Sequence, residues 1–443
     1  MDLPLAGAPE QKISSGNPVR KVALLGGDYP GMRPTLHVAE GDRVKRGQIL
    51  FDDKKNEGVL YTAPAAGRVI AINRGAKRFM QSVVIDTTDG DGDQPFDAWR
   101  EGLIASTDGE AIRKLLIESG QWTAIRTRPF GQVPAVDSRP TAVFVPAMDT
   151  NPLAANPDIV IEEQRDAFRD GLRALSCLTD GPVWVCRAAE SGLDSFAEGN
   201  IREERFSGPH PAGNPSTHIH FLHPVSRNRE AWVVGYQDVI AIGKLLSTGR
   251  LYTDRVIAIG GPRAKQPRLV RTRLGAAVED ICRDEMIGEA DDNRVVSGSV
   301  FNGHHARGPL AFLGRVANQI TILREGNDRR MFGYLSPGLK RHSAMNIYLS
   351  KLWPNKRLEL DTSTNGSERA MVPLGQYEKV MPLDILPTQL LRSLIVGDIE
   401  MAESLGALEL VEEDLALCTY VCVGKYEYGP ILRDNLERIQ KEG

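Results

Sequence analysis

The sequence predicts a multidomain protein of mixed α/β and α+β class. A chain of 443 residues is long enough for about two to four separate hydrophobic cores. β-type residues and glycine turns dominate its first part, strand and helix patterns then alternate, and short β runs followed by helices complete the chain. We therefore expect domains at residues 1–100, 101–253 and 254–330, with a linker and a helical domain at 331–443.

The first domain is organised around residues 38–70, where glycines separate short β-type segments. Glycine permits a positive φ at tight turns, and Val44 between Arg43 and Lys45 fits a strand that is buried on one face. The pattern resembles the barrel-sandwich hybrid fold of lipoyl and biotinyl carrier domains. Those carriers are modified on a lysine at a hairpin, where this chain has Lys54 and Lys55. We expect a charged, solvated turn there, and a modified lysine is the alternative.

The second domain shows strands in alternation with helices, which predicts a Rossmann-like α/β fold. Its first helix has Thr107 as the expected N-cap, Glu110 as the partner in a capping box, and Gly120 as the stop. Its last helix is expected to begin near Asp238 and to end at Gly249. Between these helices we expect strands at 142–145 and 183–186 and one long amphipathic helix at about 161–178.

The third domain has a different pattern, with short β runs and one short helical stretch at 276–284. This pattern predicts a β-grasp module of the SLBB-like kind. Helical patterns dominate from residue 384 onward and predict a C-terminal helical domain. The β runs lie at residues 256–259, 269–272, 294–296 and 319–323.

Composition excludes several classes of function. The net charge is −4, from 54 basic and 58 acidic residues, and so nothing favours nucleic acid as a partner. No apolar run approaches the roughly 20 residues that a transmembrane helix needs. The N-terminus lacks the pattern of a signal peptide. We expect a cytoplasmic protein whose contact with a membrane goes through a partner.

Two groups of residues have the chemistry of metal ligands. An H-x-H pair, His218 and His220, would place both rings on one face of a strand and could chelate a metal ion. We expect hydrogen-bonded loop histidines instead, and a metal site is the alternative. Cys418 and Cys422 are too few for an Fe–S cluster or a zinc site, and we expect no metal. The complete histidine group is His210, His218, His220 and His223.

Sequence motifs along the whole chain point to one family. They include GMRPT at 31–35, DKKN at 53–56, TAPAAG at 62–67, RTRPF at 126–130, AMDTNPLAA at 147–155, GPHPAG at 208–213, LYTDRV at 251–256, MVPLG at 371–375 and GKYEYG at 424–429. On these motifs the chain resembles the A subunits of bacterial Na⁺-translocating NADH:quinone oxidoreductases. It is more distantly similar to the C subunit of the Rnf complex and to the flavin-bearing subunit of complex I.

The resemblance implies a peripheral subunit on the cytoplasmic face of the bacterial inner membrane, within a six-subunit complex. That complex oxidises NADH, reduces ubiquinone and exports Na⁺, and its flavins and Fe–S centres lie in partner subunits. This chain is then expected to bind no redox cofactor, to help bind ubiquinone beside the membrane subunit that binds quinone and flavin, and to be inactive alone. The alternative is a flavin-dependent NADH dehydrogenase subunit that retains a flavin or Fe–S site.

The loop that cradles flavin in those distant relatives is replaced here. Where they have a glycine-rich loop, this chain has RTRPFG at residues 126–131, whose side chains fill the space that glycine leaves for a phosphate and a ring. Of the ferredoxin-like cysteines of the Rnf subunit, this chain keeps Cys418 and Cys422 alone. The resemblance therefore implies a retained fold that has lost its electron carriers.

Two segments are candidates for the quinone contact. A quinone head needs an apolar slot with a few hydrogen-bond donors for its carbonyl oxygens. Arg33 and Arg128 are the candidate donors, and Met32 and Phe130 are the candidate packing partners. The alternative is that the arginines hold domain interfaces together. The complete candidate set is Met32, Arg33 and Leu36 in the first segment and Arg126, Arg128 and Phe130 in the second.

Overall fold

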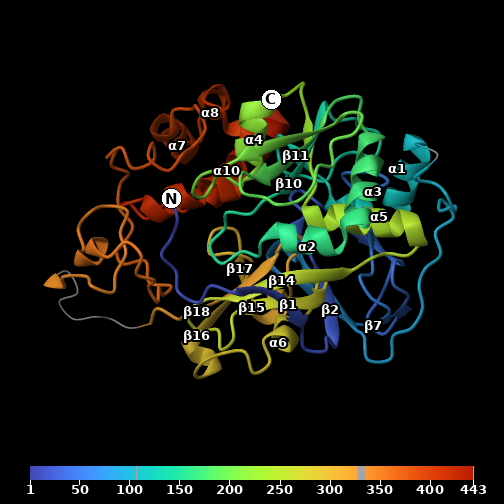
Figure 1. Ribbon diagram of the computed structural model, residues 1–443, viewed down its shortest axis with the longest axis horizontal. Helices are drawn as coiled ribbons and strands as arrows, with labels where there is room; N and C mark the ends of the chain where they lie inside the picture. The colour runs from blue at the N-terminus through green and yellow to red at the C-terminus, as the bar shows by residue number, and fades with distance from the viewer. Residues whose placement is uncertain (106, 328–334, 443) are drawn as a thin grey trace.

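The computed structural model describes residues 1–105, 107–327 and 335–442. Figure 1 shows two large parts, an α/β part that carries α2, α3 and α5 and a β-rich part that carries β1, β14 and β15. The C-terminal helices α7, α8 and α10 lie beside the α/β part. The chain starts close to these helices, because Met1 packs against their hydrophobic core.

The N-terminal domain consists of two small sheets in which every strand pair is antiparallel. Both sheets contribute to one core, which includes Val22, Leu50, Tyr61 and Ile85. The bend at residues 54–56 connects two strands of the smaller sheet, as expected for the charged turn. The larger sheet has the order β2 (Lys21–Leu25), β8 (Met80–Asp86), β7 (Gly67–Arg74), β4 (Arg43–Val44), and the smaller has the order β3 (Pro34–Leu36), β5 (Ile49–Asp53), β6 (Leu60–Thr62).

The second domain is built on a five-stranded sheet. Four strands are parallel, in the order β12 (Ile201–Phe206), β11 (Val183–Ala188), β10 (Ala142–Ala147), β13 (Ala231–Val233), and β9 (Arg126–Arg128) adds an antiparallel edge. Side chains of β10 alternate between two cores: Val143 and Val145 face the core that includes α3 and α5, whereas Phe144 faces the core that includes α4. The helices are α1 (Gly109–Glu118), α2 (Pro157–Glu163), α3 (Arg165–Ser176), α4 (Pro215–Leu222) and α5 (Tyr236–Thr248).

Three helix boundaries differ from the sequence prediction. Asp108, not Thr107, caps α1, because its side chain accepts the Ala111 N–H at 3.1 Å. The expected long helix is two helices, since the backbone of Gln164 leaves helical geometry between α2 and α3. Helix α5 begins after Gly235, which leaves the expected N-cap Asp238 inside its first turn. The predicted stop at Gly249 is confirmed, because this residue takes the left-handed conformation that favours glycine.

A six-stranded sheet forms the third part of the molecule. Its edge strand β1 lies within residues 1–100, the predicted first domain, yet it pairs in parallel with β15. This pairing joins sequence-distant segments, so no local pattern indicates it. The order is β1 (Glu10–Ser15), β15 (Arg268–Arg273), β14 (Asp254–Gly260), β18 (Gln319–Arg324), β16 (Asn293–Ser297), β17 (His304–His305), with α6 (Val278–Ile281) as its short helix.

The C-terminal part is helical from residue 387 onward, as expected, and has its own hydrophobic core. Its helices are α7 (Pro387–Val396), α8 (Ile399–Ser404), α9 (Ala416–Val421) and α10 (Tyr428–Glu442). None of the helices in the described part of the chain combines the length and the apolar character needed to span a bilayer. Short 3-10 turns lie at Gly26–Asp28, Ala76–Arg78, Gln121–Ala124, Ala290–Asp292, Gly308–Leu310, Leu349–Leu352, Ala407–Glu409 and Glu412–Leu415.

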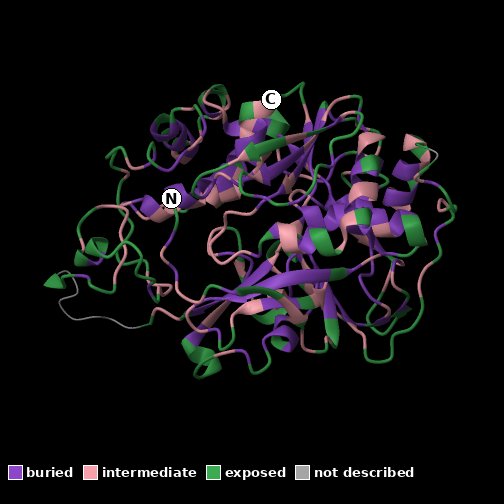
Figure 2. Cartoon of the chain, in the orientation of Figure 1, coloured by how far each residue is buried: buried purple, intermediate pink, exposed green. Residues whose placement is uncertain are grey.

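Burial separates a compact body from one exposed segment. Figure 2 shows buried residues through the sheets and the helices that cover them, and mostly exposed or intermediate residues in the loops at the far left. The largest core extends from the N-terminal domain into the second domain, and the pair Trp122 and Trp232 is fully buried inside it, edge to face. The first two domains therefore pack as one hydrophobic unit.

Candidate functional site

The two segments that the sequence indicates for quinone lie side by side. Arg126 donates a hydrogen bond of 3.0 Å to the carbonyl oxygen of Asp28, and its guanidinium lies 5.2 Å from the ring centroid of Tyr29. Gly31 is left-handed, and a Cβ on it would come within 2.9 Å of the side-chain nitrogen of Gln132. Only glycine fits here without displacing Gln132, so the sequence of each segment is adapted to the other.

Arg126 belongs to a buried group of charges that we call the ionic cluster, formed by Asp28, Arg126, Asp238, Arg255 and Arg315. Asp238 accepts hydrogen bonds from Arg255 at 2.5 Å and from Arg315 at 2.7 Å. Burial by itself would raise the pKa of Asp238, but Arg315 and Arg255 lower it below its usual value. Burial raises the pKa of Asp28. The cluster joins the first domain, the second domain and the six-stranded sheet.

Arg128 points to a different place, toward Ser216 in the first turn of α4. Its side chain is 4% exposed and donates to the hydroxyl of Ser216 at 3.3 Å and to the carbonyl of Thr127 at 3.1 Å. Burial lowers its pKa, and the charges of Asp414 and Glu413 act in the opposite direction. Phe130 follows at a positive φ, and its carbonyl accepts from Arg433 at 2.6 Å.

Sequence reasoning did not select Glu413, which interacts with the charges of Asp414, Arg128 and Asp149. Asp414 is buried, whereas Glu413 and Asp149 are half-buried. We call this group the carboxyl-edge cluster, formed by Asp149, Glu413 and Asp414 with Arg128. Asp414 accepts from the side-chain amide of Asn214 at 3.0 Å. Burial, together with the nearby Asp414, raises the pKa of Glu413 to about 7. Asp149 comes two residues after the end of β10, and its place at a carboxyl edge was the one available signal.

The three candidates of the first segment differ in accessibility. Met32 is 7% exposed and belongs to the main core, and Leu36 is half-buried in β3 opposite Phe51. Arg33 is exposed, and its backbone N–H donates to Asp53 at 2.9 Å. Its guanidinium has no hydrogen-bond partner within the described residues. Arg33 is thus the candidate cation whose side chain is available to a ligand, whereas Arg126 and Arg128 bind protein groups.

Backbone donors of the second segment are used inside their own turn. The N–H of Thr127 donates to the carbonyl of Gln132 at 2.8 Å, and the N–H of Gly131 donates to the carbonyl of Thr127 at 3.1 Å. The N–H of Gln132 donates to the hydroxyl of Thr127 at 3.2 Å. A loop that cradles phosphate needs such donors to point outward, so this turn does not have the geometry of a flavin loop.

The charged turn of the first domain is also packed. The side-chain amide of Asn56 donates to the carbonyl of Val133 at 2.9 Å, next to the second quinone segment. Lys54 and Lys55 are exposed. Asn56 therefore fixes the hairpin against the second domain, which disfavours a lysine that carries a swinging group.

The histidines do not converge. The H-x-H pair lies in helix α4, neither in the loop that we expect nor in the strand that a metal site would require, and residues two apart on a helix point in different directions. His218 contacts the carbonyl of Ala212 at 3.0 Å, whereas His220 contacts Glu409 at 2.6 Å. His223 contacts the Thr141 hydroxyl at 2.9 Å. Within the described ranges, no group of three or more metal-ligating side chains is found.

The two C-terminal cysteines are buried in the helical core. The thiol of Cys422 lies between the hydroxyls of Tyr377 at 3.2 Å and Tyr428 at 3.4 Å. Burial would raise its pKa, but the hydrogen bonds from both tyrosines lower it. Cys418 is also buried, and burial raises its pKa to about 12. Both thiols thus serve as packed side chains in this structure.

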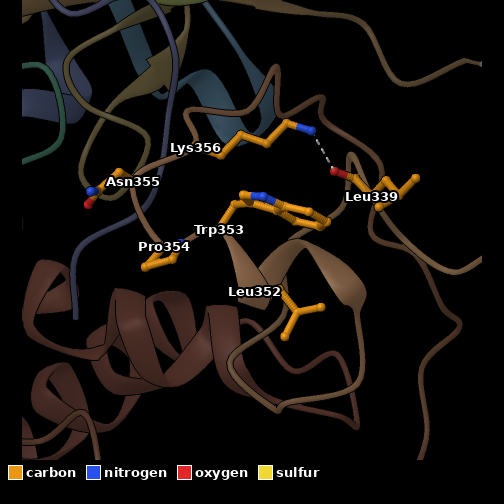
Figure 3. Close-up of a pocket in the computed structure, with 6 residues that line it drawn as sticks. All are labelled: Leu339, Leu352, Trp353, Pro354, Asn355 and Lys356. Carbon is orange, nitrogen blue, oxygen red and sulfur yellow. Dashed lines mark hydrogen bonds between the residues drawn. The ribbon is translucent and has the colours of Figure 1, made fainter.

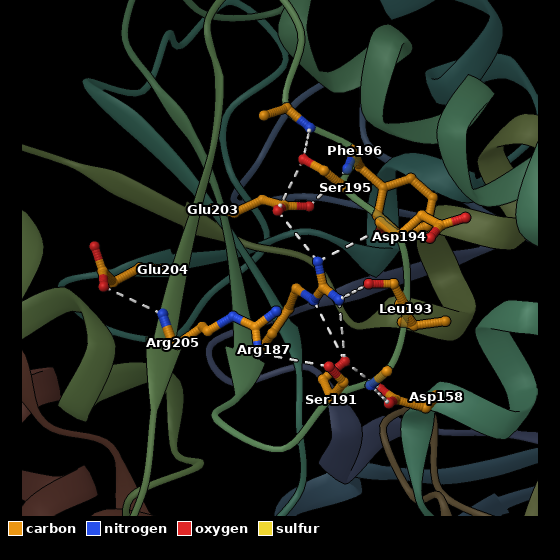
Figure 4. Close-up of polar contacts among 12 residues, drawn as sticks. Asp158, Arg187, Ser191, Leu193, Asp194, Ser195, Phe196, Glu203, Glu204 and Arg205 are labelled. Carbon is orange, nitrogen blue, oxygen red and sulfur yellow. Dashed lines mark hydrogen bonds and ion pairs between the residues drawn. The ribbon is translucent and has the colours of Figure 1, made fainter.

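Two further features lie outside the candidate segments. An open hollow of about 460 Å³ is lined by Leu339, residues 352–354, Asn355 and Lys356 (Figure 3). Arg187, at the end of β11, holds the loop that follows it through Ser191, Leu193 and Glu203 (Figure 4). Neither feature contacts a residue that the sequence proposes for quinone.

Comparison with known protein families defines the class of protein. A model described as the NqrA N-terminal barrel-sandwich hybrid domain matches residues 1–88, and one described as the NqrA second alpha/beta domain matches residues 107–251. A third, described as the NQRA C-terminal domain, matches residues 256–308. The barrel-sandwich prediction for the N-terminal domain is thereby confirmed.

Curated relatives cover the chain from end to end. The A subunit of the Na(+)-translocating NADH-quinone reductase from Alcanivorax borkumensis is 61% identical over 443 residues, 100% of this chain and 98% of that protein. The proteins of the same name from Saccharophagus degradans and Vibrio parahaemolyticus are 56% and 54% identical, with the same coverage. The chain therefore belongs to the family of A subunits of Na⁺-translocating NADH-quinone reductases. A chain of the NAD⁺-reducing [NiFe]-hydrogenase matches at 13% identity over 52% of this chain and 49% of its own length, with a TM-score of 0.38.

Proposed function

We propose that this chain serves as a peripheral subunit of a Na⁺-translocating NADH:ubiquinone reductase, on the cytoplasmic face of the membrane. In this role it carries no redox cofactor, helps to bind ubiquinone and contributes to assembly of the complex. The names of its relatives and its lack of a spanning helix in the described residues support this proposal. NADH oxidation, the flavins and the Fe–S centres are then assigned to partner subunits, and no observation favours an independent flavin-dependent dehydrogenase.

One observation carries the proposed quinone contact: the segments at 31–36 and 126–132 lie together and leave the guanidinium of Arg33 exposed. A quinone carbonyl is a hydrogen-bond acceptor, and a guanidinium is a strong donor in a fixed geometry. Phe130, half-buried beside the helical core, offers an aromatic face for the ring or tail. We therefore assign the donor role to Arg33 and the packing role to Phe130, Leu36 and Met32. Arg126 and Arg128 shape the surroundings of the site.

The sheets and turns of the structure support our descriptions of the domains. Parallel strands with helices on both faces are typical of a Rossmann-like domain, and we propose that description for the second domain. We propose a β-grasp module for the sheet that contains β14 and β18. The inward-bonded turn at residues 127–132 supports the proposal that no flavin binds there. We also propose the domain boundaries that the sequence predicts, with the exception of β1, which pairs into the third sheet.

The test uses the whole complex that carries Arg33→Ala or Phe130→Ala. The loss of one hydrogen bond or one ring contact is expected to raise the KM for quinone roughly five- to thirtyfold, since each contributes about 1–2 kcal/mol. NADH oxidation with an artificial acceptor stays unchanged. Arg43→Ala, at an exposed arginine of β4, is the matched control. If both variants assemble and their quinone kinetics equal those of the wild type, the contact lies in other subunits.

A second measurement addresses the cofactors. The purified chain is expected to show no visible absorbance of flavin or Fe–S type and an intact mass that equals its sequence mass. Stoichiometric flavin, iron or a lipoyl-sized mass increase on Lys54 or Lys55 would contradict the proposal.

A further inference from the structure

Residues 335–358 expose an unusual number of large apolar side chains. Each of the six is at least 46% exposed, and Leu335 reaches 72%. Scattered apolar residues are normal at a surface, but their concentration in one segment marks an interaction site. The segment lies in the largely exposed region at the far left of Figure 2. The side chains are Leu335, Leu339, Ile347, Leu349, Leu352 and Trp353.

The same segment is strongly basic. It contains five basic residues and no acidic residue, within a chain whose net charge is −4. Lys340, Lys351 and Arg357 are exposed. The combination of exposed leucine and tryptophan with lysine and arginine is typical of surfaces that bind anionic lipid, because apolar groups enter the interface while cations meet the headgroups. The basic residues are Lys340, Arg341, Lys351, Lys356 and Arg357.

The apolar and basic groups share one hollow, which Figure 3 shows. Leu339, Leu352 and Trp353 line it together with Lys356, whose ammonium donates to the carbonyl of Leu339 at 3.1 Å. Lysine often covers apolar surface with its methylene stem while its charged end faces water. An amphipathic hollow of this kind suits a lipid surface better than it suits a polar small molecule.

Contacts at both ends hold the segment in place. The N–H of Leu358 donates to the carbonyl of Pro4 at 2.6 Å, and the N–H of Ala6 donates to the carbonyl of Leu358 at 2.9 Å. Near the other end, His342 contacts the hydroxyl of Tyr420 at 2.6 Å. The exposed apolar groups are therefore presented on a surface that the helical core and the N-terminus support.

We propose that residues 335–358 dock on the surface of an anionic membrane. This proposal rests on the proposed peripheral role and adds a direct lipid contact to it. The sequence leads us to expect membrane contact only through a partner, because its basic residues form no continuous block. The fold places them on one short segment with the exposed apolar groups, and charge complementarity then selects anionic headgroups as the partner.

The test is sedimentation of the full chain with vesicles of phosphatidylcholine alone or mixed with phosphatidylglycerol. Binding to the anionic vesicles is expected to be at least tenfold stronger and to weaken as salt rises. A variant with Lys340→Gln, Lys351→Gln and Arg357→Gln is expected to lose at least tenfold in binding. Leu352→Ser with Trp353→Ser is expected to lose binding to a similar extent. Equal binding to both vesicle types would overturn the proposal.

A second exposed site that combines apolar and basic residues provides a control for the location of the docking surface. The β7–β8 hairpin exposes Phe79 beside Lys77 and Arg78. A variant with Phe79→Ser, Lys77→Gln and Arg78→Gln is expected to bind anionic vesicles like the wild type. If the hairpin variant loses binding and the 335–358 variants retain it, the docking surface is wrong. Val396→Ser, at a residue 77% exposed on α7, controls for the loss of an exposed apolar side chain.

The outcome is separable from that of the proposed function. If the chain copurifies with membrane partners but ignores bare anionic vesicles, residues 335–358 serve a protein partner and the lipid proposal fails alone. If it binds vesicles while Arg33→Ala leaves quinone kinetics unchanged, the quinone assignment fails alone. Circular dichroism and thermal unfolding of each variant show whether a loss of binding comes from a loss of fold.

Discussion

The guanidinium of Arg126 lies 5.2 Å from the ring centroid of Tyr29 and donates to the backbone carbonyl next to that ring, at Asp28. Tyr29 in turn packs edge to face on Tyr61, with 4.7 Å between ring centroids. A single arginine of the second domain thereby engages both the backbone and the aromatic core of the first domain. Arg126 therefore has a structural role, although it lies beside the proposed quinone contact.

Arg126→Ala is expected to lower the free energy of unfolding by about 2–4 kcal/mol, because it removes a cation–π contact and leaves buried carbonyls without their donor. Urea unfolding of the purified chain measures this change. Arg33→Ala, which removes an exposed guanidinium of the neighbouring segment, is the control and is expected to cost less than about 0.5 kcal/mol. An Arg126→Ala cost as small as that of the control would show that the interface does not depend on this side chain.

Arg187, fully buried near the end of β11, pairs at 3.1 Å with Glu203, which is half-buried in β12 (Figure 4). Glu203 also accepts from the N–H of Phe196 at 2.6 Å, and so the pair fixes the loop between the strands. Arg187→Met is expected to destabilise the chain by about 2–3 kcal/mol, since it removes the charge-assisted hydrogen bonds of a buried guanidinium and leaves the half-buried carboxylate without its cation.

A double-mutant cycle with Glu203→Gln separates the pair from its surroundings. The double variant is expected to be less destabilised than the sum of the two single variants, because the second change removes the unpaired charge. Additive effects would mean that the two side chains act independently, contrary to the geometry.

The carboxyl-edge cluster predicts a pH dependence with a definite sign. The pKa of Glu413 is raised from 4.5 to about 7, mainly by burial. Between these values the unfolded chain is ionised while the folded chain keeps its proton, so the free energy of unfolding falls as pH rises through this window. Glu413→Gln removes the titration. At pH 8 this variant is expected to be more stable than the wild type by about 3 kcal/mol, and at pH 4 the advantage should vanish.

Urea unfolding of both proteins across this pH range measures the difference. A constant difference between wild type and variant at all pH values would rule out Glu413 as the titrating group. Asn302→Ala, which removes the amide that contacts Glu413 at 3.4 Å, tests whether the cluster rather than the single residue sets the effect.

Features of the fold that depend on local sequence could be predicted, whereas those that depend on tertiary packing could not. The stop at Gly249 was predictable because a left-handed residue after a helix favours glycine. The expectation of loop histidines at His218 and His220 was wrong, because the helical state of α4 depends on its packing against the sheet and an H-x-H pattern does not reveal it. The parallel pairing of β1 with β15 involves no local signal at all.

The candidate site could be predicted only in part, because it also depends on tertiary packing. Sequence motifs and the family resemblance selected Arg33 and Arg128. They did not reveal that Arg33 is exposed whereas Arg128 is buried against Ser216. Glu413 lies far from Asp149 in sequence, and only the fold brings both to the carboxyl edge of the sheet. Burial and partners, which decide between a ligand-binding and a structural arginine, are tertiary properties.

The pH dependence of stability expected from His218 has the opposite sign to that expected from Glu413. Burial lowers its pKa to about 4, and its ring packs on Phe206 with 4.3 Å between centroids. Between pH 6.5 and 4 the unfolded chain takes up a proton on this ring while the folded chain does not, so the free energy of unfolding falls as pH drops through this window. The loss is expected to reach about 2 kcal/mol at about pH 5.

Since Glu413 changes stability in the other direction over much of the same range, the wild-type curve alone does not resolve either group. His218→Gln in the Glu413→Gln background isolates the histidine: relative to Glu413→Gln alone, the double variant should lose stability less steeply below the ordinary histidine pKa of 6.5. Parallel curves for the two proteins would show that this imidazole does not govern acid unfolding.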